Sequence, residues 1–106
     1  MSDAIEIGRY TCHYFSSRDR DEVVLYLYDM GSTVIGRIFA VPDGVPLPPA
    51  GRRDGCVALY FHRAVMPQIL DLLRNEGPVY LLWNDGQDAE LATGYEPVGE
   101  GEENRT

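Results

Sequence analysis

Three segments of this chain alternate aliphatic and tyrosine-bearing positions, a pattern that constrains the fold more than any other feature. They are Glu22–Asp29, Cys56–Phe61 and Val79–Trp83. In each segment, one set of alternate positions holds mainly valine and leucine. In two of the segments this set ends in a large aromatic residue, Phe61 or Trp83. The other set of positions carries tyrosine. Because neighbouring side chains of a strand point to opposite faces, the pattern predicts a sheet with an aliphatic face and a tyrosine-rich face.

Apolar spacing along the whole chain predicts six strands. We expect them at Ala4–Phe15, Glu22–Asp29, Thr33–Val41, Cys56–Phe61, Pro78–Asn84 and Asp88–Gly94. The first three follow one another closely and favour an antiparallel meander. The last two form a hairpin around Asp85-Gly86-Gln87. Gly8 lies where the apolar phase of the first strand changes, which indicates a bulge.

One amphipathic helix is expected at about Ala64–Asn75, with Val65, Met66, Ile69, Leu70, Leu72 and Leu73 on one arc. Pro67 fits only its first turn, and Gly77 followed by Pro78 predicts a left-handed glycine cap. The elements therefore predict an α+β domain in the order β-β-β-loop-β-α-β-β. It is built on a mostly antiparallel sheet of about six strands, and the helix packs on one face.

The length of 106 residues fits a single domain, which we place at residues 1–95, followed by a flexible acidic tail at 96–106. The chain shows no bilayer-spanning apolar run and no export signal, so we expect a cytoplasmic protein. Its net charge is −8, and all nine basic residues are arginine. An acidic chain is repelled by polyanions, which argues against nucleic acid and membrane surfaces as partners.

Metal or thiol chemistry has little support in the residue spacing. Cys12, His13, Cys56 and His62 are the soft ligands, and their spacing matches no zinc pattern. Both cysteines lie in apolar strand segments, which favours inert thiols. The carboxylates mostly fall in turns, at strand ends and in the tail. We therefore expect no catalytic residue, no metal site and no cofactor; whether Cys12 and Cys56 lie close together stays open.

The connection Pro42–Gly55 is rich in proline and glycine and is either a functional loop or a mobile one. Within it, Arg52 and Arg53 could hold an anionic ligand. Pro46-Leu47-Pro48-Pro49 looks like a polyproline ligand, although stiffening of a connector explains it as well.

Two hypotheses for function follow. The first is a non-enzymatic interaction module, in which a tyrosine face carrying Tyr26, Tyr28, Tyr60 and Tyr80 forms a homodimer or binds another protein. The second is a small-molecule binder or enzyme in which the 42–55 loop acts as a lid. Tyrosine also suits strands without any partner, and the composition alone does not separate these interpretations.

The block Leu72–Tyr80 (LLRNEGPVY) and the ending Glu96–Glu102 (EPVGEGE) resemble short uncharacterised bacterial proteins with a similar helix–hairpin and acidic Gly-Glu tail. The resemblance covers about the last third of the chain. It implies a bacterial cytoplasmic protein and carries no site or chemistry with it.

Overall fold

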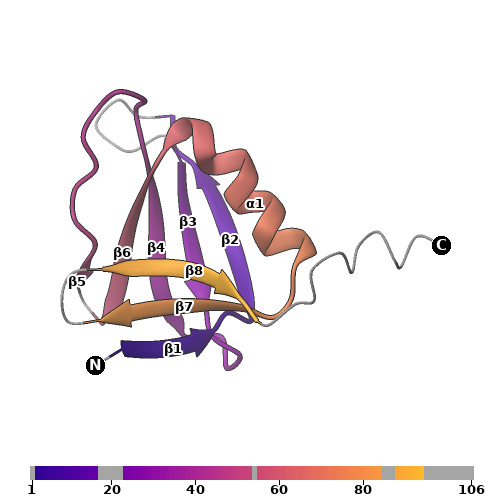
Figure 1. Ribbon diagram of the computed structural model, residues 1–106. Helices are drawn as coiled ribbons and strands as arrows, with labels where there is room; N and C mark the ends of the chain where they lie inside the picture. The colour runs from indigo at the N-terminus through magenta and orange to yellow at the C-terminus, as the bar shows by residue number, and fades with distance from the viewer. Residues whose placement is uncertain (1, 17–22, 54, 85–87, 95–106) are drawn as a thin grey trace.

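The computed structural model describes residues 2–16, 23–53, 55–84 and 88–94, and within them eight strands form two sheets with one α-helix (Figure 1). The strands are β1 (Ser2–Glu6), β2 (Arg9–Tyr14), β3 (Val23–Tyr28), β4 (Val34–Val41), β5 (Gly51–Arg53), β6 (Cys56–His62), β7 (Val79–Asn84) and β8 (Ala89–Thr93). A 3₁₀ turn at Arg63–Val65 leads into α1, Met66–Asn75.

The larger sheet has the order β2-β3-β4-β6-β5, and the smaller has the order β1-β7-β8. Only the β4–β6 pair is parallel among these strands; the other pairs are antiparallel. The α+β class is confirmed, as are the meander, present as β2-β3-β4, and the C-terminal hairpin, present as β7-β8. The parallel pair arises because the chain returns from the end of β4 through the loop and β5 before it enters β6.

The first predicted strand is divided between the two sheets at Gly8. The Ile7 N–H donates to the Val79 carbonyl of β7 over 2.9 Å, whereas the next N–H, of Gly8, donates to the Tyr28 carbonyl of β3 over 2.8 Å. A Cβ atom on Gly8 would lie 2.7 Å from the Asp29 carbonyl oxygen. The expected bulge at Gly8 is therefore a crossing from one sheet to the other, and only glycine fits there.

The core lies between the two sheets and the helix. Leu25, Ile38 and Leu59 are register partners across β3, β4 and β6 and are fully buried. Leu81 of β7 and Ile69 of α1 belong to the same apolar cluster. Figure 1 shows β1, β7 and β8 crossing the larger sheet at a steep angle, with α1 beside them. The aliphatic face is therefore covered by a second sheet as well as by the expected helix.

The sheets approach most closely at Gly36 in β4. A Cβ atom at this position would lie 3.1 Å from Leu81 Cδ2 and 3.2 Å from the Val57 carbonyl oxygen. The missing side chain lets β7 lie directly over β4, which explains the glycine inside an otherwise apolar strand.

Helix α1 matches its predicted range, with Pro67 in the first turn, but the predicted cap is wrong. Gly77 is not among the described residues with positive φ; the helix ends because Glu76 is extended, with its N–H donating to the Leu72 carbonyl over 3.0 Å. Gly77 is joined to Pro78 by a cis peptide bond.

The loop after β4 is exposed from residue 42 to residue 49 and is tied to the start of the helical segment. Asp43 Oδ1 accepts the Ala64 N–H over 3.0 Å, and His62 Nε2 lies 2.7 Å from the Val45 carbonyl oxygen. Strand β5 lies inside the segment expected to be a loop, and it pairs with β6.

No helix within the described ranges is long and apolar enough to cross a membrane. The expected tail at 96–106 and the hairpin turn at Asp85-Gly86-Gln87 lie outside the described residues.

Replacing Gly8 with alanine tests the crossing point. The new methyl group would meet backbone atoms of Asp29 and Met30 that cannot move independently, so Gly8→Ala should lower the free energy of unfolding by about 2 to 3 kcal/mol. Urea denaturation measures the change. Gly51→Ala is the matched control, because a Cβ there meets no atom within 4 Å. It should change stability by less than about 0.5 kcal/mol, and equal losses in both variants would contradict the crossing geometry.

Candidate functional site: the outer face of the larger sheet

The larger sheet has a second face, here named the outer face, that points away from the core. Among the described helices and strands, those outside this sheet all lie on its other side, where Ile69 and Leu81 join the core. Strand register gives the outer face two central rows, Thr11–Tyr26–Arg37–Ala58 and His13–Val24–Phe39–Tyr60. Register also places Tyr28 on this face, beside Arg9 and Val34.

Side-chain contacts hold the aromatic rings of the outer face in place. The Phe39 and Tyr60 rings are stacked, with centroids 5.4 Å apart and planes at 22°. The His13 ring meets Tyr26 edge-on, with centroids 4.8 Å apart. Thr11 Oγ1 lies 3.0 Å from His13 Nε2 and 3.3 Å from the Tyr28 hydroxyl. The rings therefore form a preorganised surface and not a set of independent side chains.

Small side chains on the outer face are buried although no described element covers them. Val24 is 4% exposed, Ala58 7% and Cys56 9%. Their larger neighbours, including Phe39 and Tyr60, screen them and remain half-buried themselves. The accessible part of the outer face therefore consists of ring faces and edges, which lie above a layer of closely packed small residues.

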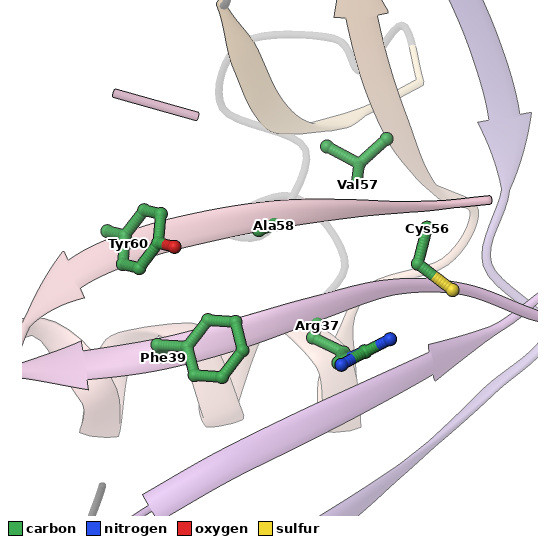
Figure 2. Close-up of a pocket in the computed structure, with 6 residues that line it drawn as sticks. All are labelled: Arg37, Phe39, Cys56, Val57, Ala58 and Tyr60. Atoms are coloured by element: carbon green, nitrogen blue, oxygen red, sulfur yellow. The ribbon is translucent and has the colours of Figure 1, made fainter. Parts of the chain in front are cut away.

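A hollow of about 60 Å³ opens on this face beside Arg37. Figure 2 shows Phe39 and Tyr60 side by side on neighbouring strands, with Arg37 further along β4 and Cys56 further along β6. Ala58, the register partner of both Arg37 and Gly51, lies between them and leaves the space open. The Cys56 thiol lies 3.5 Å from the Val34 carbonyl oxygen, so it is oriented by the backbone.

The five strands of the larger sheet contain no aspartate and no glutamate. The whole chain has 17 acidic residues and a net charge of −8. Arg37 is half-buried, and no carboxylate in the described part of the chain forms an ion pair with it. The outer face is therefore locally cationic in a protein that is acidic as a whole.

Three of the four predicted interface tyrosines come together, and the fourth does not. Tyr26, Tyr28 and Tyr60 lie on the outer face. Tyr80 lies in β7 between the buried Val79 and Leu81, so it points outward from the smaller sheet, on the opposite side of the molecule. Tyr80 alternates with aliphatic residues along β7, as the tyrosines do along β3 and β6, but β7 belongs to the smaller sheet.

Of the two predicted anion contacts, Arg52 does not lie on the outer face. The Arg52 guanidinium lies 4.8 Å from the centroid of the Trp83 ring, on the side of the core. The backbone of Arg53 pairs with Cys56, and its side chain lies outside the described part of the structure.

The sequence did not indicate Arg37, Phe39 and His13 as site residues, because the predicted interface was based on tyrosine alone. These three residues lie on the same face of the sheet as the buried Val24 and Ala58, so the strand register is the signal that identifies them as part of the site.

The two cysteines lie on opposite faces of the larger sheet. Cys12 pairs in register with the buried Leu25, whereas Cys56 lies on the outer face; both are free thiols. Cys12 raises the pKa of the exposed Tyr14 phenol through a side-chain hydrogen bond and through its charge. Within the described ranges, no group of three or more histidine, cysteine or acidic side chains could hold a metal ion.

Comparison with known protein families, with curated proteins and with solved structures finds no match to this chain. The resemblance of the C-terminal block to short bacterial proteins stays a prediction.

A double-mutant cycle tests whether the ring pair is preorganised. The Phe39→Ala and Tyr60→Ala changes should be coupled by about 1 kcal/mol, because each removes the same stacked contact. Chemical denaturation of the two single variants and the double variant measures this coupling. Tyr28 and Tyr60 lie on strands separated by β4, so that pair should be additive within about 0.5 kcal/mol. An additive Phe39–Tyr60 pair would show that the stacked contact contributes no coupling energy.

Proposed function

We propose that this protein is a non-enzymatic interaction module that binds another protein chain on the outer face of its larger sheet. The observation that carries the proposal is the combination of preorganised rings, a half-buried arginine and the absence of acidic residues on one sheet face that no other described element covers.

The composition of the outer face fits a protein interface. Protein-binding surfaces are enriched in aromatic residues and arginine and depleted in aspartate, glutamate and lysine. Tyr26, Phe39 and Tyr60 supply apolar area on side chains with few rotatable bonds. The Phe39–Tyr60 stack and the contact of Tyr26 with His13 reduce the ordering that binding requires. Arg37 adds a directional donor at the centre of this area.

The dimensions of the outer face favour a modest interface. Five strands about 4.8 Å apart span about 19 Å, and six residues along a strand span about 20 Å, so the flat area is about 400 Å². A stable interface of standard size buries about 800 Å² per partner. The outer face is therefore suited to a bound segment or to a transient partner, and a homodimer through this face would need further contacts around it.

Site-specific photocrosslinking tests the proposal in the native host. A benzoyl-phenylalanine side chain at position 26 or 60 should give covalent adducts with a partner chain, because both positions lie on the outer face. Tyr80 is the matched control: it is also a half-buried strand tyrosine, but it lies on the opposite side of the molecule.

Adducts from positions 26 and 60 but not from 80 are the expected result. An adduct of twice the 11.9 kDa chain mass would identify the partner as a second copy. Equal adducts from position 80, or none from any position, would contradict an interface on the outer face.

A small-molecule site under the proline loop is the second candidate function. A cavity of about 310 Å³ lies between the loop at Pro48 and Ala50, β6 at Tyr60 and Phe61, and Asp88 before β8. This volume is in the range of ligand pockets. Asp88 is the only charged residue among the described ones that line it, so the cavity suits a neutral or cationic molecule, and not the anion that Arg52 and Arg53 suggested.

Thermal unfolding with a library of neutral and amine-bearing metabolites tests this candidate. A ligand of the cavity should raise the Tm of the unmodified protein by several degrees at saturation. Ala50→Trp should abolish the rise by filling the cavity, whereas Val45→Trp, an exposed loop position that does not line it, should preserve the rise. If no compound raises the Tm, or if both variants respond alike, the lid hypothesis loses its support.

A further inference from the structure

We infer that the hollow beside Arg37 is a carboxylate-binding site, and that it receives an acidic side chain from the protein segment that binds the outer face. The inference rests on the proposed interaction function and adds the chemistry of the partner.

Arg37 forms no ion pair with a carboxylate in the described part of the chain. The guanidinium carries five N–H donors in a planar fork that matches a carboxylate with two parallel hydrogen bonds. Arg37 is half-buried in the centre of a sheet, and its register partners Tyr26 and Ala58 provide no negative charge. Covering this charge without supplying an anion would be strongly unfavourable, because an unpaired buried charge is costly. Any chain that covers the outer face must therefore compensate Arg37.

The shape of the hollow fits a small planar anion. Its volume of about 60 Å³ opens on the outer face and is lined by Phe39, Tyr60 and Cys56, above the small Ala58. A single water molecule needs only about 10–15 Å³ of such space, so the hollow has room for a carboxylate group. The aromatic walls lower the local dielectric constant, which strengthens a hydrogen-bonded ion pair formed there.

A second copy of the chain does not supply this anion through the same face. In an isologous dimer the outer face would meet itself, and the strands that form it contain arginine and histidine but no acidic residue. The compensating carboxylate must then come from a segment of different composition. Charge complementarity thus favours an acidic protein segment over a self-paired sheet.

Nucleic acid would use the same rings but needs a different charge pattern. Single-strand binding combines stacking rings with a basic groove that follows the phosphates. Among the described residues, Arg37 is the only charged one that lines the hollow, and the chain as a whole carries a net charge of −8. A single local arginine pairs with one carboxylate, but it does not offset the repulsion of a phosphate backbone.

Peptide titration with a matched pair of arginine variants tests the inference. Decaglutamate is the acidic probe and decaglutamine the neutral one, and both are followed by fluorescence anisotropy and by amide chemical shifts. Decaglutamate should bind more tightly and shift the amides of Arg37, Phe39 and Ala58. Arg37→Gln should weaken its binding at least tenfold, whereas Arg74→Gln, which removes the same charge from the exposed end of α1, should change it less than about twofold. Arg37→Lys should give an intermediate loss, because the charge stays and the fork is removed.

Three results would overturn the carboxylate site: equal binding of the two peptides, equal losses from Arg37→Gln and Arg74→Gln, or tighter binding of decathymidylate than of decaglutamate. The outcome is separable from the proposed function. Crosslinks from positions 26 and 60 that persist in Arg37→Gln would keep the interface and reject the carboxylate site. Arg37-dependent peptide binding without such crosslinks would keep the site and reject the protein interface.

Discussion

Two successive hydrogen bonds, from the N–H groups of Ile7 and Gly8, determine how this chain is arranged. The first joins β7 and the second joins β3, so neighbouring residues belong to different sheets. The chain changes direction there with no room for a side chain, because the backbone of Asp29 and Met30 lies against Gly8. This crossing places β1 beside the hairpin and lays the smaller sheet over the larger one.

Stacking of the two sheets explains where the outer face comes from. Once β7 lies over Gly36, and Ile69 of α1 completes the same layer, the aliphatic residues of β3, β4 and β6 are removed from water on one side. No described helix or strand is left for the other side. The aromatic residues of that side pack on one another across strands, which buries Val24 and Ala58 beneath them. The small residues at the base of the outer face are thus buried, whereas its aromatic rings remain accessible to a partner.

Local patterns predicted what depends on local structure. Alternation in β3 placed Tyr26 and Tyr28 on one face, and the apolar arc of α1 placed Ile69 towards the core. Sheet membership is set by pairing between distant segments, so the pattern of β7 could not show that Tyr80 belongs to another surface. Strand β5 has the sequence Gly-Arg-Arg, which has no apolar alternation to detect. The role of Arg37 depends on neighbours from other strands, which the sequence around Arg37 does not show.

Net charge is a poor guide to the chemistry of one face. Strands in general are depleted in acidic residues, so their absence from the core side of the larger sheet requires no further cause. The outer side differs, because a solvated strand face normally alternates polar or charged residues of both signs with the apolar ones. Here the outward positions hold rings, small residues, Thr11 and two arginines, Arg9 and Arg37. The strands of the larger sheet carry no carboxylate, and Arg37 forms no ion pair within the described residues, so this charge distribution is complementary to the acidic segment that we propose as the partner.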